Sequence, residues 1–295
     1  MASATTDQTP ERLWLCMTDS NRTRVVSRAL AKGLGMTVYM GPTMDDEGPV
    51  ALVVADDAHV KRIAEARTNA AENQKSLFVT GNAKRSGADI YLDHDCDAGT
   101  LCNAIEGLRA LRDYELGNPE ESDAGAKALR CMHDGEFLVR TLEEARDLAM
   151  MVGRSCPRPE PVSVGLYVLL ANAIEHGNLG FDATEKAKGL ADGNWKRKLA
   201  RRLEEPAYRD RRVRLSVHRG PRALSLIVQD DGEGIDAETA EMANPSAAGY
   251  RGKGIKLARS MGFTQLSYMG VGNTVEATII LTQPAEPEGA RQVAV

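Results

Sequence analysis

Short apolar runs alternate with segments of helical periodicity in the first part of the chain. Five of these runs read as buried strands, at residues 13–18, 36–40, 51–55, 76–80 and 88–92. Helical stretches follow the first, third and fifth runs, at residues 21–33, 58–73 and 97–115. Such alternation is typical of a parallel sheet with helices on both faces. Residues 12–115 are therefore predicted to form a doubly wound α/β domain with five parallel strands, although only a short connection remains between the second and third.

A different pattern begins after a polar segment that contains Gly and Pro, at residues 116–130, which we interpret as a linker. Three helical segments are predicted next. Residues 141–153 form an amphipathic helix, residues 162–177 a helix that is apolar almost throughout, and residues 182–206 a polar helical insertion. The insertion carries an apolar stripe for docking, formed by Leu190, Trp195, Leu199 and Leu203.

The apolar period then changes to two, which predicts two pairs of half-buried strands, at residues 212–219 with 223–230 and 263–269 with 274–282. Helices followed by such strands favour an α+β sandwich, with the helices on one face of a mixed sheet. The second domain is predicted to span residues 131–283. Residues 1–11 and 284–295 are expected to be flexible tails.

Composition narrows the functional classes. The net charge of −5 argues against a nucleic-acid-binding surface. There is no apolar run near the ~20 residues that a membrane span requires, and the N-terminus does not have the pattern of a secretory signal. The five cysteines lack CxxC spacing, which favours free thiols in a reducing compartment. We therefore expect a cytoplasmic protein that binds neither nucleic acid nor membrane.

Three features of the second domain are candidates for chemistry. Asn172 is an amide on the apolar helix and needs a polar partner. Residues 230–236, DDGEGID, follow a predicted strand, and two closely spaced glycines there let the backbone approach a ligand. Residues 249–255, GYRGKGI, open a predicted helix whose N-terminal NH groups suit a phosphate. Each feature alone also has an ordinary structural explanation.

Together, in this order and context, these features resemble the GHKL ATPases. The resemblance covers roughly residues 130–282 and is strongest to the bacterial anti-sigma-factor serine kinases, through residues 172–180, the Arg-led hairpin at 211–213 and GKGIKLARSMGF at 252–263. It implies the GHKL (Bergerat) ATP-binding fold, with ATP and magnesium as cofactors.

The resemblance also implies roles for individual residues. Asn172 would ligate magnesium through its side-chain oxygen, and Asp230 would accept a hydrogen bond from the adenine amine. Residues 236–251 would form a lid. The remaining ATP-binding candidates are His176, the pair Gly232 and Gly234 at the adenine edge, and Gly252, Lys253 and Gly254 at the phosphates.

One position departs from the family pattern. These kinases usually carry a glutamate one helical turn before the asparagine, where it serves as a general base, and here that position is Val168. Glu175 and His176 are the remaining candidates for a base on this helix. General-base catalysis contributes about 10²–10⁴-fold to a rate, so weak or absent phosphotransfer is expected. A sensor histidine kinase would need a phosphoacceptor on a helical hairpin, and the only candidate, His133, has none around it.

The first domain resembles a response-regulator receiver. Asp56 would be the phosphoacceptor, with Thr80 as its hydroxyl switch, and Asp57 is its neighbour. Of the paired acids after the first strand only Asp19 is present, because Thr18 replaces the other, and His94 stands where a lysine is usual. The domain is thus a degenerate receiver. It would either be phosphorylated by an upstream histidine kinase or act in docking or homodimer formation through its last strand and helix.

The sequence as a whole predicts a bacterial signalling regulator that binds Mg-ATP and acts by partner switching. Its expected partner is an anti-sigma-factor antagonist or a sigma factor. Two alternatives remain open: an active serine/threonine protein kinase that phosphorylates the antagonist, and an adaptor that binds no nucleotide.

Overall fold

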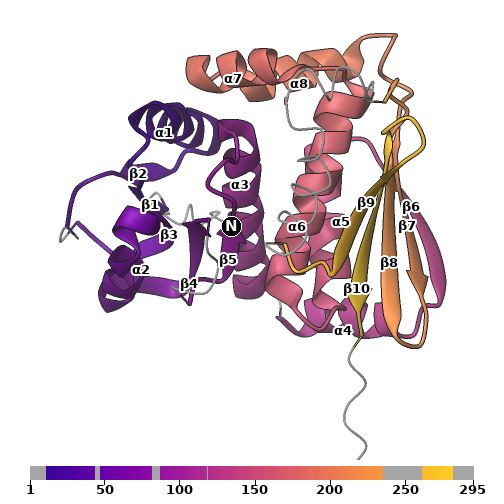
Figure 1. Cartoon of the computed structure of the whole chain (residues 1–295), viewed down its shortest axis with the longest axis horizontal. Coiled ribbons are helices and arrows are strands. Elements are labelled where there is room, and N and C mark those ends of the chain that lie inside the picture. The colour runs from indigo at the N-terminus through magenta and orange to yellow at the C-terminus, as the bar shows by residue number, and fades with distance from the viewer. Residues whose placement is uncertain (1–10, 44–46, 82–86, 118, 235–260, 282–295) are drawn as a thin grey trace, which may run out of the picture.

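The computed structural model describes residues 11–43, 47–81, 87–117, 119–234 and 261–281. Two five-stranded sheets lie at opposite sides of the molecule, and helices fill the space between them (Figure 1). The chain therefore contains two α/β units, as the change of apolar period predicts.

The first sheet is parallel throughout. Its strands are β1 (Arg12–Cys16), β2 (Thr37–Tyr39), β3 (Val50–Asp56), β4 (Ala70–Val79) and β5 (Ile90–Leu92). They lie in the order β2-β1-β3-β4-β5, an order found in doubly wound sheets. All seven residues of β3 except the last are buried, which is why the strand reads as a continuous apolar run. The prediction of five parallel strands is confirmed.

The helices of this unit differ in part from the prediction. Helix α1 (Ser20–Leu34) begins at its N-cap Asp19 and ends at Gly35, whose φ of 65° favours glycine. Helix α3 (Ala98–Leu116) also matches its predicted range. The helix predicted at 58–73 is wrong in extent: α2 (Lys61–Ala66) lies between two 3₁₀ turns, Asp57–His59 and Arg67–Asn69, and β4 begins at the next residue.

The second sheet is antiparallel throughout, so the predicted mixed sheet is wrong. Its strands are β6 (Asp134–Val139), β7 (Val213–Arg219), β8 (Ala223–Gln229), β9 (Gln265–Met269) and β10 (Thr274–Ile280), in the order β6-β7-β8-β10-β9. The four predicted strands match β7 to β10, and β6 was not predicted. It is an edge strand paired only with β7 among the described residues, and its weak alternation reflects an exposed Leu138.

The helices of this unit lie on one side of the sheet (Figure 1). They are α4 (Pro119–Arg130), α5 (Leu142–Arg154), α6 (Pro159–Asn172), a π-helix η3 (Ala173–Asn178), α7 (Ala183–Asp192) and α8 (Trp195–Glu204). Of these, α7 and α8 extend toward α1 of the first unit. Thr141 and Glu144 form a capping box that starts α5. The segment interpreted as a linker is instead mostly helix α4, because Ala126 is buried and Lys127 and Arg130 suit the negative end of a helix dipole.

Helix α3 joins the two units. It stands between the parallel sheet and α6 (Figure 1), and ten of its residues are buried, around most of its circumference. Gly107 lies at the contact with α6, where an added Cβ would be 3.1 Å from both Tyr167 Cδ1 and Val164 Cγ1. Buried residues of both units belong to one continuous apolar core, so the two units pack as one body.

Three of the four residues of the predicted docking stripe are buried, and the fourth, Leu203, is half-buried. Leu190, Trp195 and Leu199 are 5–7% exposed, and α7 packs on α1 of the first unit, as Figure 1 shows. The Arg28 guanidinium donates a 3.0 Å hydrogen bond to the Ala191 carbonyl across this contact. None of the described helices combines the length and the apolar composition that a bilayer crossing requires.

The close contact at Gly107 yields a stability prediction. Gly107→Leu should lower the free energy of unfolding by about 1–3 kcal/mol, because the larger side chain overpacks the α3–α6 contact. Gly125→Leu in α4 is the matched control, since an added Cβ there meets nothing within 4 Å. Urea unfolding of both variants measures the difference, and equal stabilities would contradict the tight packing.

Candidate functional site

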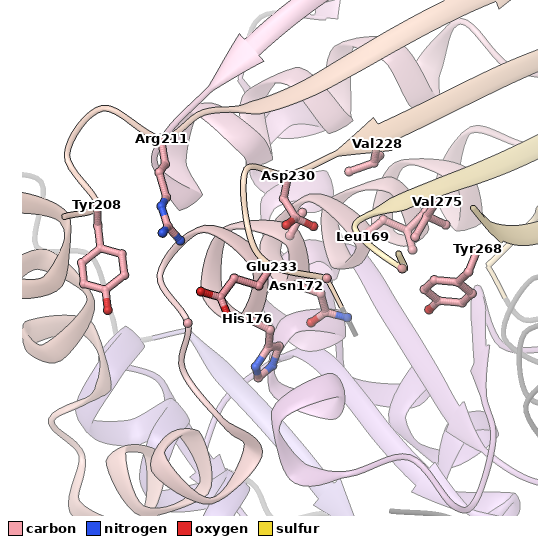
Figure 2. Close-up of a pocket in the computed structure, with 15 residues that line it drawn as sticks. Leu169, Asn172, His176, Tyr208, Arg211, Val228, Asp230, Glu233, Tyr268 and Val275 are labelled. Carbon is pink, nitrogen blue, oxygen red and sulfur yellow. The ribbon is translucent and has the colours of Figure 1, made fainter. Parts of the chain in front are cut away.

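A cavity of about 510 Å³ opens between the helical layer and the antiparallel sheet. It is lined by polar residues from the α6–η3 segment, by the turn after β8, and by apolar side chains of α6, β8 and β10 (Figure 2). Four of the residues singled out from the sequence line it together, namely Asn172, His176, Asp230 and Gly234.

A change of helix type positions the polar residues. Asn172 is the last residue of α6, and the next six residues form a π-helix. The Leu179 N–H donates to the Ile174 carbonyl at 2.9 Å, the i to i+5 spacing of this wider turn. As a result, neighbouring residues face different surroundings: Glu175 is fully buried, whereas His176 lines the cavity.

His176 is oriented by the backbone carbonyl of Phe181, five residues further along the chain. Its Nδ1 lies 2.6 Å from the Phe181 carbonyl oxygen, which can only accept a hydrogen bond. Nδ1 therefore carries the proton, and in the neutral ring Nε2 is left as an acceptor. His176 thus remains a candidate base in the cavity.

Glu175 does not fit the role of a base. Its Oε2 accepts hydrogen bonds from Lys186 Nζ at 2.6 Å and Asn103 Nδ2 at 3.2 Å, and its Oε1 accepts one from Trp195 Nε1 at 2.9 Å. The side chain has no exposed surface and is not part of the cavity lining. These contacts argue against Glu175 as a substitute base, because the π-helix places its side chain beside Asn103 of the first unit.

Val168 is also outside the cavity. It is fully buried in the core, while its neighbour Leu169 lines the cavity. A valine carries no titratable group, so the position that the family resemblance assigns to a base supplies none.

Asp230 is fixed at the end of β8. Its Oδ1 accepts a 2.9 Å hydrogen bond from the Gly232 N–H, and its backbone exchanges hydrogen bonds of 3.0 and 3.2 Å with Asn273. Burial raises the pKa of Asp230 above its usual value, and the nearby charge of Asp231 adds to this, whereas the hydrogen bond from Gly232 opposes it.

Two glycines pack against this carboxyl group, and a third lies further along the same turn. A Cβ on Gly177 would lie 2.2 Å from Asp230 Cγ, and one on Gly232 would lie 2.5 Å from the Gly177 carbonyl oxygen. Gly234 has a φ of 82°, and its Cβ would lie 2.3 Å from the Val271 carbonyl oxygen. Gly232 and Gly234 were predicted from the sequence. Gly177 was missed, although it follows His176 directly.

Several other lining residues were missed as well. Tyr208 and Arg211 come from the connection between α8 and β7, and the Arg211 guanidinium lies 5.2 Å from the Tyr208 ring centroid and donates to the Asn178 carbonyl. No local motif in the sequence marks them. Glu233 lies within the glycine motif after β8, so its neighbours Gly232 and Gly234 could have signalled it. The candidates Gly252, Lys253 and Gly254 and the predicted lid at 236–251 lie outside the described residues.

Asp56 and Asp57, at the carboxyl end of the parallel sheet, each have their own hydrogen-bond partners. Asp56 accepts a 2.5 Å hydrogen bond from the Thr18 N–H and lies 2.6 Å from His59 Nδ1. Burial raises the pKa of Asp56, but the Thr18 and His59 contacts outweigh it, and the pKa is lower than usual. The Thr80 hydroxyl donates a 2.6 Å hydrogen bond to Asp57, so Asp57 has the partner that was expected for Asp56.

The other two predicted members of this group have different contacts. Asp19 caps α1 through the N–H groups of Asn21 and Arg22. His94 lies 3.1 Å from Asp93 and 2.9 Å from Asp95. Both side chains thus have local structural partners. His133 precedes β6, where its exposed ring lies 2.9 Å from Asp134, outside any helical hairpin.

Comparisons of the chain with models of protein families, with curated proteins and with solved structures find no match.

The raised pKa of Asp230 predicts a pH-dependent stability. The Asp230 carboxyl group holds its proton more tightly in the folded state than in the unfolded chain. The free energy of unfolding therefore falls as the pH rises from 3.8 through the raised pKa of the folded state. Asp230→Asn removes the buried charge and keeps an oxygen for the Gly232 N–H. In the absence of ligand, the variant should therefore be more stable than the wild type at neutral pH, with the difference shrinking below pH 4. Chemical unfolding at several pH values measures this, and a variant that is less stable at neutral pH would contradict it.

Proposed function

We propose that the cavity binds ATP with magnesium, and that the chain is a signalling regulator of the anti-sigma-factor kinase type whose first unit resembles a receiver. The cavity volume lies within the range of about 300–1,000 Å³ for small-molecule sites. Its walls combine apolar side chains, among them Leu169, Val228 and Val275, with a few convergent polar groups. This combination suits a flat base with polar edges.

The position of Asp230 carries the proposal. The Gly232 N–H donates a hydrogen bond to Asp230 Oδ1, and Asp230 Oδ2 has no hydrogen-bond partner among the described residues. Because Asp230 lines the cavity, a ligand edge in the cavity could approach this oxygen. A carboxylate there would accept a hydrogen bond from the exocyclic amine of adenine, and it would disfavour guanine, whose carbonyl oxygen lacks a hydrogen to donate.

Asn172 lines the same cavity from the helix opposite Asp230 (Figure 2). Its side-chain oxygen would hold magnesium, which would bridge the phosphates. The wall of one cavity thus carries both the proposed base-recognising group and the proposed metal-binding group.

Nucleotide binding without efficient phosphotransfer fits these residues best. Val168 supplies no base, and Glu175 is fully paired in the interior. The nucleotide would then control binding of an anti-sigma-factor antagonist or a sigma factor. One observation favours the alternative of an active serine kinase: the tautomer of His176 leaves Nε2 free to accept a proton.

The first test is the binding of Mg-ATP. Wild-type protein should bind it in calorimetry, and Asp230→Asn should bind about 10- to 100-fold more weakly, the value of a hydrogen bond to a charged group. Asp231→Asn is the matched control, because Asp231 accepts from the Arg212 N–H and does not line the cavity. The absence of binding by the folded wild type would refute the proposal.

The second test separates the two functions. Wild-type protein, mixed with labelled ATP and a candidate antagonist, should transfer little phosphate, and Val168→Glu should not restore transfer, because the new carboxyl group would be buried without a partner. That variant should also lose about 3 kcal/mol or more of stability, whereas the uncharged Val168→Thr should lose less. Ordinary transfer rates that disappear in His176→Ala would support the kinase instead.

A further inference from the structure

A buried polar cluster connects the two units directly beside the cavity. It consists of Asn103 on α3, Asn172 and Glu175 on the α6–η3 segment, Lys186 on α7 and Trp195 on α8. Asn103, Glu175 and Lys186 are 3%, 0% and 4% exposed. In this interior each polar group must find a partner within the protein, so the partners fix one another's orientation.

The orientation starts at Lys186 and Trp195. An ammonium group and an indole N–H can only donate, and they donate to Glu175 at 2.6 and 2.9 Å. Glu175 therefore acts as an acceptor. Asn103 must turn its Nδ2 toward it, at 3.2 Å from Oε2.

The Asn103 amide then orients Asn172. Its Nδ2 carries two hydrogens, and it also lies 3.5 Å from Asn172 Oδ1. If Asn172 were turned over, two amide NH₂ groups would face each other. The oxygen of Asn172 is therefore kept on the side of α3, and an amide oxygen has a second lone pair for another partner.

We propose that Asn103, from the first unit, is a positioning residue for the magnesium ligand Asn172. This inference rests on the proposed Mg-ATP function. The metal site would then be completed by both units, and its affinity would depend on the packing of α3 against α6. By linkage, Mg-ATP would in turn favour that packing.

The test compares the magnesium dependence of ATP binding in the full-length protein. Calorimetry measures the dissociation constant of ATP for each variant, once in EDTA and once in excess magnesium. The constant in EDTA divided by the constant in magnesium gives the ratio by which magnesium strengthens binding. Asn103→Leu, which has a similar shape and no donor, should reduce this ratio by about 3- to 10-fold, the loss of one orienting hydrogen bond. Cys102→Ala is the matched control, since Cys102 is equally buried on the same helix and is not part of the cluster.

A purely structural role for Asn103 would change stability but leave the ratio unchanged, and that result would overturn the inference. Asn103→Ser, which keeps a donor in a smaller side chain, should give an intermediate ratio and serves as the second variant if Asn103→Leu does not fold. Wild-type protein that binds ATP with no effect of magnesium would also refute the inference. Wild-type protein that binds no ATP at all would refute the proposed function itself.

Discussion

The arrangement of this molecule depends on pairing the buried carboxylate of Glu175. A charge without exposed surface is costly unless it is paired and hydrogen-bonded, and the donors here come from three different helices: Asn103 on α3, Lys186 on α7 and Trp195 on α8. The Glu175 carboxylate thereby links the α6–η3 segment to α3 of the first unit and to α7 and α8. Removing one donor would leave a charge poorly compensated, so the two units are coupled more tightly than their separate sheets suggest. Apolar contacts, such as that of Gly107 with Tyr167, add packing but less directional constraint.

The sequence predicted the elements whose signals are local. Buried parallel strands read as apolar runs and the antiparallel strands as alternation, so nine of the ten strands were expected. The Asn172 and Asp230 pair was also identified, because each lies in a recognisable context. Strand β6 was missed, since its edge position leaves Leu138 exposed and weakens the alternation. The helical character of α4 was missed because Gly and Pro in a polar segment resemble a linker.

The errors at the candidate site arise from backbone geometry that residue spacing does not encode. A regular helix would place positions 168, 172 and 176 on one face, but the structure buries Val168 and changes to a π-helix after Asn172. Glu175 then faces the first unit, where its partner Asn103 lies 72 residues away in sequence. Gly177 could be understood only once Asp230 was seen beside it, because the requirement for glycine arises from a contact between distant segments.

The proposed function explains why the site keeps features that do not favour stability. A half-buried Asp230 with a raised pKa opposes folding at neutral pH, and glycines at positions 177, 232 and 234 increase the entropy lost on folding. A structural role alone would be served as well by an amide or a small apolar side chain. A carboxylate facing an open cavity is useful only when a ligand donates to it. The same reasoning separates the proposed binding from transfer. The groups proposed to hold a nucleotide lower the stability of the fold, whereas Val168, at the position where the resemblance implies a base, only fills the core. This contrast underlies the proposal of a nucleotide-controlled switch.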